Sequence, residues 1–416
     1  MKVLHVTPEL PRWPGGSGGA TRQFHLLRRL AELGHEVIVV APATEAERED
    51  RSLERAGIRA LLYERPPSRV AETLGTLARR PSLVPAAARL PVLAWQVRVF
   101  WQHLRPLALA ALRDERPDVV LVEHDYAASW AADLPADIPK AVTLENLSWR
   151  YYETRARAAS PARGALLRAE AWRFARHDRR QLTRFRLAIA MSDEDARCVP
   201  EVADIPVTVV ANGVDTSALA ALPDSDARAC VLFTGTLAYP PNAEGIVWFV
   251  ERAWPAVRAQ HPDARLRIVG RDAPRAVRAL SERPGVEVVG FVPDLRPYFE
   301  EATVAIVPVR SGGGTRLKAL EAMSSGRALV STRLGVEGIA VEPGRHVLVE
   351  DDPEAFGAAV ALLLGDRTRR AELAAAARRL VEERYDWRVL GEQLASALER
   401  LSGRSEPGPV AHPGEI

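Results

Sequence analysis

Cysteine and lysine are both scarce in this chain of 416 residues. The two cysteines, Cys198 and Cys230, are too few for a disulfide framework or for a zinc site built from cysteines. The only lysines are Lys2, Lys140 and Lys318, although Lys and Arg together number 56 against 54 Asp and Glu. The resulting formal charge of +2 gives no general affinity for nucleic acid, so we expect no nucleic-acid partner.

Long hydrophobic runs are also missing. No apolar stretch approaches the roughly 18 residues that a membrane span needs, and the first apolar run stops at Pro8. We therefore expect no signal peptide and a cytoplasmic protein. Hydrophobic residues at 47% and charged residues at 26% are typical of a globular chain, and the length suits two domains that each bury a core.

Both halves of the chain repeat the pattern strand, helix, strand. Apolar strand patterns occupy residues 2–7, 35–41, 118–123, 140–144 and 187–191, then 230–234, 265–269, 286–289, 304–309 and 328–331. Such spacing is typical of parallel strands joined by right-handed crossovers. We predict an α/β fold of two tandem doubly wound, Rossmann-like parallel-sheet domains that face each other across a cleft.

The domain boundaries follow from composition. We predict a first domain at residues 1–215, a second at 216–385, a C-terminal helix at 386–402 that packs back toward the first domain, and a disordered tail at 403–416. The segment 218–229, rich in Ala, Pro and Asp, is predicted to be the interdomain linker.

A glycine-rich loop follows the first predicted strand. Gly16, Gly18 and Gly19 would let the backbone approach a ligand at the carboxyl end of that strand. A nicotinamide or flavin site fits poorly, because the spacing is not G-x-G-x-x-G and the second strand ends in Ala41-Pro42-Ala43, where a ribose-binding acid would be expected. We therefore expect no redox cofactor.

The segment from Val304 to Thr332 carries the main prediction. An apolar strand leads into a glycine loop and then a helix, so backbone N–H groups at a helix N-terminus favour an anion such as a diphosphate. Cations in the first turn are misplaced for stability unless an anion binds there, and a carboxylate further along could accept hydrogen bonds from a ribose. The residues concerned are Gly313, Gly314, Thr315, Arg316, Lys318 and Glu321. An ordinary strand-to-helix connection with surface charges is the alternative.

Polar residues also follow two predicted strands of the first domain. His124 comes directly after residues 118–123, and Glu145 with Asn146 comes after residues 140–144. The carboxyl edge of a doubly wound sheet is where ligands bind, and a histidine can transfer a proton near neutral pH. We predict that His124 belongs to the active site and that Glu145 and Asn146 lie on the acceptor side.

Two segments bear on membrane contact. Residues 90–112 mix apolar and aromatic side chains with arginines, which fits either a helix packed on the sheet or one that lies on an anionic bilayer. Residues 149–186 hold eleven arginines against three acids. Such a run is usually a solvated helix face, with a site for an anionic acceptor or lipid head group as the alternative. A peripheral contact with the inner face of a membrane is thus left open.

The order and spacing of several motifs resemble GT-B fold glycosyltransferases of the retaining family 4 type (glycosyl transferases group 1), in the branch with GGGTRLK. These are the first glycine loop, Ser192-Asp193, Asn212 to Asp215, Gly235, Val269-Gly270, Gly290-Phe291-Val292, and Gly314 to Met323 followed by Gly326. The resemblance covers nearly the whole chain.

The resemblance implies a transferase that moves a sugar from a nucleotide-diphosphate sugar, held mainly by the second domain, to a glycan, lipid-linked or small-molecule acceptor. The resemblance also implies a role in polysaccharide biosynthesis, and it implies neither a metal nor a separate cofactor. Arg316 and Lys318 would stabilise the departing diphosphate, and Glu321 matches the second glutamate of the family's paired motif, which binds ribose. His124 would contact the donor sugar. The residues that would contact the donor and its base are Gly235, Gly270, Phe291 and Val292.

Two departures from the family pattern concern the donor. Gly313 stands where a first glutamate often contacts the sugar, and residues 234–242, TGTLAYPPN, lack a basic pair. Two alternatives therefore stay open. One is another GT-B enzyme, such as an inverting transferase or a nucleotide-sugar epimerase, and the other is a catalytically inactive nucleotide-sugar-binding partner.

Overall fold

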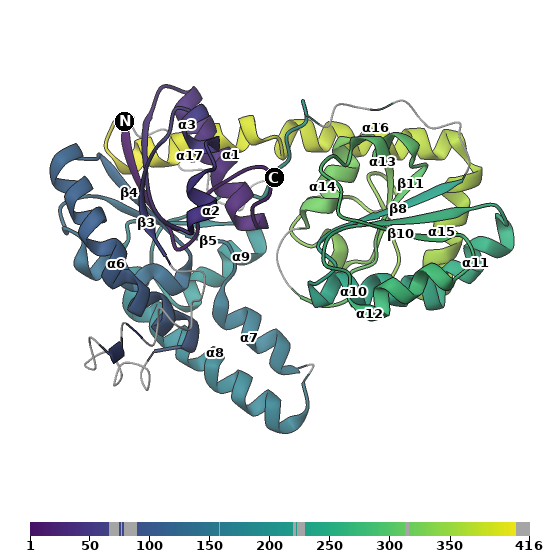
Figure 1. Cartoon of the computed structure of the whole chain (residues 1–416), viewed down its shortest axis with the longest axis horizontal. Coiled ribbons are helices and arrows are strands. Elements are labelled where there is room, and N and C mark those ends of the chain that lie inside the picture. Colours follow the sequence, from purple (N-terminus) through teal and green to yellow (C-terminus); the bar gives the residue numbers. More distant parts are fainter. Residues whose placement is uncertain are drawn as a thin grey trace. The chain divides into compact units, whose positions relative to one another are not determined.

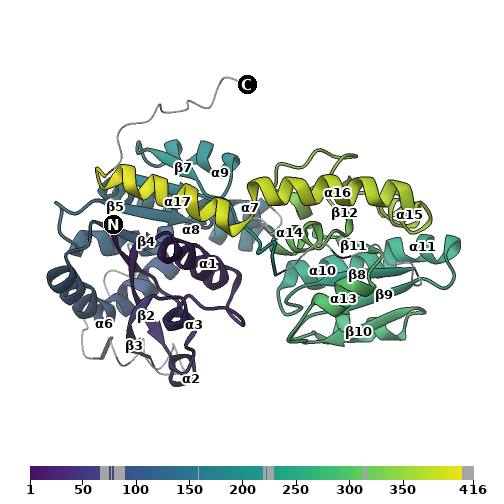
Figure 2. The same cartoon turned by 90° about the horizontal axis from the view of Figure 1, so that it is seen from above.

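The computed structural model describes residues 1–65, 75, 77–78, 90–157, 159–218, 222, 229–312 and 316–404. The chain divides into two compact units, Asn212–Val389 and Met1–Ala211 together with the chain from Leu390 onward. Each unit is a parallel sheet with helices on its faces (Figures 1 and 2). The predicted α/β class with two doubly wound parallel sheets is therefore confirmed.

The first unit holds a seven-stranded sheet in the order β3-β2-β1-β4-β5-β6-β7. Its strands are β1 (Lys2–Val6), β2 (Glu36–Ala43), β3 (Arg59–Glu64), β4 (Val119–Glu123), β5 (Lys140–Leu144), β6 (Leu187–Ala190) and β7 (Val207–Val209). Its helices include α1 (Gly18–Glu32), α2 (Glu45–Arg48), α3 (Ser52–Arg55), α6 (Val92–Glu115), the 3-10 helix η2 (Asp125–Asp133), α7 (Ser148–Arg157), α8 (Pro161–Gln181) and α9 (Asp193–Cys198). The central strands β1, β4 and β5 are buried along almost their whole length because helices cover both faces of the sheet.

The second unit holds a six-stranded sheet in the order β10-β9-β8-β11-β12-β13. Its strands are β8 (Cys230–Thr234), β9 (Arg265–Val269), β10 (Val286–Gly290), β11 (Val304–Val307), β12 (Ala328–Ser331) and β13 (Leu348–Val349). Its helices include α10 (Pro240–Trp248), the π-helical turn η5 (Phe249–Ala253), α11 (Trp254–Gln260), α12 (Arg275–Arg278), α13 (Arg296–Glu301), α14 (Leu317–Ser324), α15 (Pro353–Gly365) and α16 (Arg367–Arg384).

The strand order reverses once in each sheet. The reversal lies between β1 and β4 in the first sheet and between β8 and β11 in the second. In open parallel sheets, ligands bind beside such a switch point, outside the carboxyl ends of the strands. The two loops that the sequence singled out, after β1 and after β11, both start at these ends.

Helix α6 settles the interpretation of residues 90–112. Trp101 and Leu104 are fully buried, and the Trp101 ring stacks on Trp130 with centroids 4.6 Å apart. The indole N–H of Trp101 also donates to Asp133 over 2.7 Å. The helix therefore packs its aromatic side into the core, as the packing interpretation predicted. Within the described ranges, no helix is both long and apolar enough to cross a bilayer.

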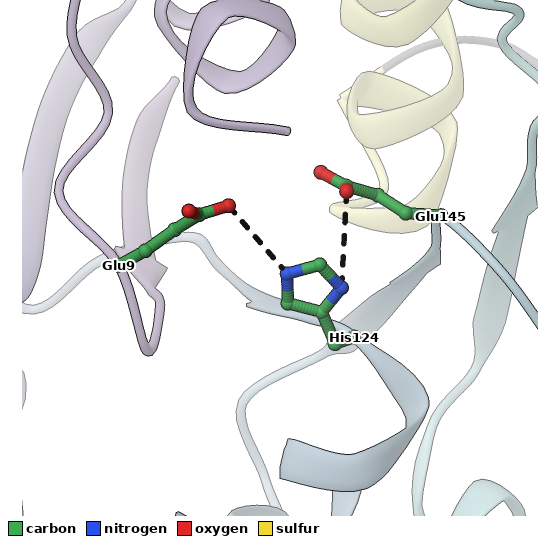
Figure 3. A group of neighbouring side chains, drawn as sticks. All are labelled: Glu9, His124 and Glu145. Carbon is green, nitrogen blue, oxygen red and sulfur yellow. Dashed lines mark ion pairs between the residues drawn. The ribbon is translucent and has the colours of Figure 1, made fainter. Parts of the chain in front are cut away.

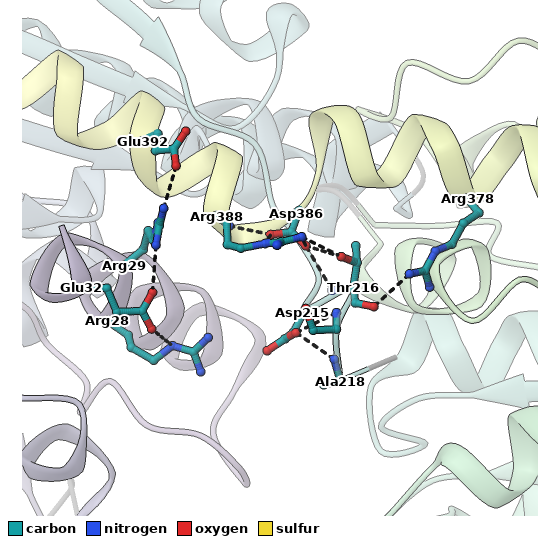
Figure 4. Close-up of polar contacts among 11 residues, drawn as sticks. Arg28, Arg29, Glu32, Asp215, Thr216, Ala218, Arg378, Asp386, Arg388 and Glu392 are labelled. Atoms are coloured by element: carbon teal, nitrogen blue, oxygen red, sulfur yellow. Dashed lines mark hydrogen bonds and ion pairs between the residues drawn. The ribbon is translucent and has the colours of Figure 1, made fainter. Parts of the chain in front are cut away.

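The two stretches that join the units are paired within the second unit (Figure 4). The Val214 N–H donates to Tyr385 O over 2.8 Å, and the Trp387 N–H donates to Val214 O over 3.2 Å. The buried carboxylate of Asp386 accepts from the Thr216 hydroxyl and from Arg388 Nε, the latter over 2.8 Å. The buried carboxylate of Asp386 therefore connects the stretch around Thr216 to the stretch that contains Asp386 and Arg388.

The chain continues from these stretches into α17 (Trp387–Leu401), whose residues from Leu390 onward belong to the first unit. There Glu392 accepts from Arg29 of α1 over 2.7 Å. The predicted disordered tail, residues 403–416, includes two described residues, Gly403 and Arg404, and Arg404 pairs with Asp118 over 2.8 Å. Residues 405–416 lie outside the described residues, as does the predicted linker 218–229 except for positions 218, 222 and 229.

We predict that Asp386→Ala lowers the free energy of unfolding of the second unit by about 2 kcal/mol, because the buried hydroxyl and N–H of Thr216 lose a charged acceptor. Urea denaturation followed by circular dichroism measures the change. Asp351→Ala is the control, since that exposed carboxylate pairs with Arg333 at the surface and its loss should cost less than about 1 kcal/mol. Equal losses in the two variants would contradict the assigned role of Asp386.

Candidate active site

Three glycines stand close together at the carboxyl edge of the second sheet: Gly235 follows β8, Gly270 follows β9, and Gly290 is the last residue of β10. Gly235 donates to Val269 O over 3.0 Å, and Gly270 donates to Gly290 O over 2.8 Å. A Cβ on Gly270 would lie 1.8 Å from the carbonyl oxygen of Gly235. A Cβ on Gly235, which has φ +151°, would lie 2.6 Å from Lys318 Nζ. Only glycine allows this close packing beside Lys318.

Lys318 lies in the first turn of α14, and its ammonium group is largely enclosed. Nζ donates to Asn242 Oδ1 over 2.5 Å and lies 4.6 Å from the centroid of the Phe233 ring. Burial, together with the nearby Arg316, lowers the pKa of Lys318 to about 7, while Glu321 opposes the shift. In the part of the chain that the structure describes, no carboxylate forms an ion pair with Lys318. A cation in this position favours an anionic ligand.

Arg316 and Glu321 flank Lys318 on the same segment. Arg316 is the N-cap residue of α14 and is buried, with Nη2 3.4 Å from Ser311 O. Glu321 lies one turn beyond Lys318, and burial raises the pKa of its carboxyl while Lys318 lowers it. The helix begins at Leu317, later than the glycine loop suggested. Gly313, Gly314 and Thr315 lie outside the described residues, so their backbone contacts stay predictions.

Phe291 and Val292 follow edge strand β10. The Phe291 ring is 71% exposed, and Val292 is half-buried. An exposed aromatic ring at the carboxyl edge of the sheet is available to stack on a planar base. The contact of these two residues with the nucleotide stays a prediction.

In the first unit, His124 is held between two carboxylates (Figure 3). Its Nε2 lies 3.8 Å from Glu9 Oε1, and its Nδ1 lies 3.9 Å from Glu145 Oε2. The ring also stacks on Tyr126 with centroids 4.5 Å apart. Burial disfavours the charged imidazolium, but Glu145 and Glu9 outweigh it and raise the pKa of His124 to about 9. His124 is therefore a cation at neutral pH.

The N-terminus of α1 is close to the same carboxylates. Ser17 caps the helix and donates its hydroxyl to Glu9 Oε2 over 2.9 Å. A Cβ on Gly19 would lie 2.5 Å from Glu145 Oε2 and 2.7 Å from Glu9 Oε1. The positive end of the helix dipole thus faces protein carboxylates. The donor contacts expected of Gly16, Gly18 and Gly19 stay predictions, as does the acceptor contact of the exposed Asn146.

A buried polar layer lies behind this cluster. Gln23 Nε2 is 3.4 Å from both Glu9 Oε1 and Glu145 Oε1, and its Oε1 accepts from the Thr7 hydroxyl over 2.9 Å. Burial, with repulsion from Glu145, raises the pKa of Glu123 to about 8. A cavity of about 10 Å³ beside Gln23 and Glu123 has room for roughly one water molecule.

Sequence analysis missed Glu9, Gln23, Phe233 and Asn242. Glu9 could have been found, because it follows β1 at the same sheet edge as His124. Asn242 lies in the segment that was noted only for its missing basic pair, and Phe233 looked like an ordinary core residue of β8. The contacts of Asn242 and Phe233 with Lys318 join distant parts of the chain, and no local sequence pattern reveals such contacts.

Comparisons with known proteins agree with this architecture. Residues 16–218 match Glycosyltransferase Family 4, and residues 228–366 match Glycosyl transferases group 1. The chain is 28% identical over 229 residues to the phosphatidyl-myo-inositol mannosyltransferase of Mycolicibacterium smegmatis. This match covers 52% of this chain and 57% of that protein.

Solved structures of similar fold span nearly the whole chain. Sucrose-phosphate synthase of Thermosynechococcus elongatus superposes with a TM-score of 0.68 at 17% identity, over 97% of this chain and 100% of that one. Anabaena HepE in complex with UDP and glucose gives 0.64 at 15% identity, over 96% and 100%. At such identities the likeness shows the fold alone.

The sequence matches to curated relatives are partial. They span 42%, 57% and 31% of the lengths of three such proteins. The two family matches nevertheless follow one another along the chain, each on its own parallel-sheet unit. The chain belongs to the GT-B glycosyltransferases of family 4, the glycosyl transferases group 1.

Proposed function

We propose that the protein is a retaining glycosyltransferase that moves a sugar from a nucleotide-diphosphate sugar to a glycan, lipid-linked or small-molecule acceptor. The observation that carries the proposal is Lys318, an enclosed cation in the first turn of α14, beside Arg316 and the close-packed Gly235 and Gly270. The name of the M. smegmatis relative, a mannosyltransferase, and the UDP and glucose bound to HepE support a donor of this class.

In the proposed reaction, the bond between the anomeric carbon and the diphosphate breaks while the acceptor oxygen bonds to the same face of that carbon. The proton of the acceptor hydroxyl goes to an oxygen of the departing diphosphate. Arg316 and Lys318 offset the charge that develops on the leaving group, and Glu321 accepts hydrogen bonds from the ribose. This route needs no pair of catalytic carboxylates.

The charge of His124 argues against its acting as the base of an inverting transferase. Such a base must be unprotonated to take the acceptor proton, and the pKa of about 9 leaves His124 protonated at neutral pH. Both ring nitrogens also face carboxylates, those of Glu9 and Glu145. His124 is therefore suited to donate a hydrogen bond or to stabilise negative charge, and poorly suited to accept the acceptor proton.

A catalytically inactive nucleotide-sugar-binding partner is the second candidate. Gly313 favours it, because a glutamate that contacts the donor sugar is absent from that position. The two candidates make the same prediction for nucleotide binding and differ in whether the donor is cleaved. Binding and cleavage are therefore measured separately.

Binding is tested by a thermal-shift panel of UDP, GDP and ADP sugars. One nucleotide class should stabilise the wild-type protein, by about 2.7 kcal/mol at 100 times its Kd. Glu321→Ala should lose the shift, and Glu372→Ala, which truncates an exposed glutamate on α16, should keep it. If no nucleotide sugar shifts the wild-type protein, the assignment of the donor site to α14 is wrong.

A further inference from the structure

Helix α8 carries two apolar faces, and only one of them is covered. Ala171, Phe174 and His177 are buried, and the Phe174 ring stacks on Tyr152 of α7 with centroids 5.4 Å apart. A second set of positions is exposed and shares another face of the helix, because its members are three or four residues apart. This set, which we call the outer face of α8, comprises Ala162, Ala165, Leu166, Ala169 and Trp172.

The large side chains of the outer face are open to solvent. Leu166 is 74% exposed and Trp172 is 61% exposed. Val92, at the start of α6, is 54% exposed and lies beside α8, because its N–H donates to Glu170 over 2.5 Å. Three of the exposed large apolar side chains of the first unit therefore lie on or beside one helix, which marks an interaction surface.

Arginines surround the outer face and are not balanced by acids. The exposed arginines of α8 are Arg163, Arg168, Arg176, Arg179 and Arg180. The guanidinium of Arg176 lies 5.6 Å from the centroid of the Trp172 ring. The two acids of the helix are already engaged, since Glu170 pairs with Arg173 over 3.4 Å and Asp178 is buried beside His177. The surface is therefore apolar at its centre and strongly basic at its rim.

We propose that the outer face of α8 docks on an anionic bilayer surface, with Trp172 and Leu166 at the level of the head groups and the arginines on lipid phosphates. A tryptophan beside arginines suits the membrane interface, and a basic rim is attracted to anionic lipid. A second copy of the chain suits this face less well, because pairing two such faces would oppose two sets of arginines. The docking surface does not depend on the transferase activity.

The sequence pointed to two segments for contact with anionic lipid, and the structure separates them. The aromatic side of α6 is used in the core, so Trp101 cannot reach a bilayer. In α8 the periodicity shows apolar residues on two faces, and the structure identifies which of them is left open. We therefore assign the contact to α8, which Figure 1 shows extending together with α7 from the first sheet.

Flotation of the full chain with vesicles tests the proposal. The wild-type protein should bind vesicles of phosphatidylcholine with about one-third phosphatidylglycerol, bind phosphatidylcholine alone weakly, and release at high salt. The double variant Leu166→Ala, Trp172→Ala should bind at least about tenfold more weakly. The triple variant Arg176→Gln, Arg179→Gln, Arg180→Gln should show a similar loss. Leu362→Ala, on an exposed position of α15 in the second unit, should bind like the wild type.

Three outcomes would overturn the proposal. They are no binding to anionic vesicles, binding that the α8 variants leave unchanged, and a concentration-dependent dimer that Trp172→Ala dissolves while vesicles do not bind. Far-ultraviolet circular dichroism confirms folding of each variant. The nucleotide thermal shift should be the same in all of them, so a failure of docking is distinguishable from a failure of the proposed function.

Discussion

Lys318→Met is expected to lower kcat for sugar transfer about 100- to 1,000-fold, the usual effect of removing one group that stabilises transition-state charge. The same change should leave the free energy of unfolding unchanged or raise it. Methionine keeps the length of the side chain and its contact with Phe233, and it removes a cation that is enclosed without a carboxylate partner among the described residues. Steady-state kinetics and thermal denaturation measure the two effects, and a variant that loses stability and activity together would contradict this account.

The stability difference has a definite pH dependence. The pKa of Lys318 is lowered to about 7 in the folded chain, against about 10.4 in an unfolded one. Below pH 7 both states carry the proton, so the cost of enclosing the cation is fully present. Between pH 7 and 10 the folded state holds fewer protons, and wild-type stability should rise toward that of Lys318→Met.

Donor binding should be linked to the same proton. A diphosphate beside Lys318 favours the ammonium form, so the wild-type protein should take up close to one proton per bound nucleotide at pH 8. Calorimetry in two buffers of different ionisation enthalpy measures this uptake. Lys318→Met should take up none. Equal uptake in both proteins would assign the proton to another group.

Glu145→Gln is expected to move the alkaline limit of activity to lower pH. Glu145 and Glu9 raise the pKa of His124 to about 9, so wild-type kcat, measured at a saturating donor concentration at which the bound diphosphate keeps Lys318 protonated, should fall as pH rises through about 9. Without the Glu145 charge, the pKa of His124 should shift back toward its usual value of about 6.5. At pH 8 the variant should therefore lose about tenfold or more of its activity, and at pH 6 it should lose much less.

The control for this profile is Glu153→Gln, which removes an exposed carboxylate from α7. Its pH profile should match that of the wild type. If Glu145→Gln lowers activity by the same factor at every pH, His124 does not depend on Glu145 for its charge.

The same pKa shift affects folding stability. Because the pKa of His124 is raised on folding, its ion pairs stabilise the protein fully below pH 6.5, and that contribution is lost as pH rises through about 9.

Much of the fold could be predicted because the strands are buried on both faces. Runs such as residues 119–122 and 304–309 are continuously apolar, and their spacing leaves room for a crossover helix. Because parallel strands end at one edge, the loops after β1, β4 and β11 could be assigned to the ligand side without coordinates. His124, Lys318 and Glu321 were predicted to be site residues in this way.

The contacts that decide the chemistry could not be predicted. Glu9, His124 and Glu145 meet only because β1, β4 and β5 are neighbours in the sheet, and Lys318 meets Asn242 across 76 positions of sequence. The charge state of His124 results from the contacts with Glu9 and Glu145, and the low pKa of Lys318 results from its burial and from Arg316. The exposed face of α8 was hidden for a related reason, because periodicity does not distinguish a covered apolar face from an open one.

The central claim is that this chain cleaves a nucleotide-diphosphate sugar with Lys318 as the charge that stabilises the leaving group. The most direct measurement is the release of nucleoside diphosphate from the nucleotide sugar that gives a thermal shift, followed by chromatography without added acceptor. We predict slow release by the wild-type protein and at least about 100-fold slower release by Lys318→Met. Tight binding of the nucleotide sugar with no release in either protein would contradict the claim and identify the chain as an inactive binding partner.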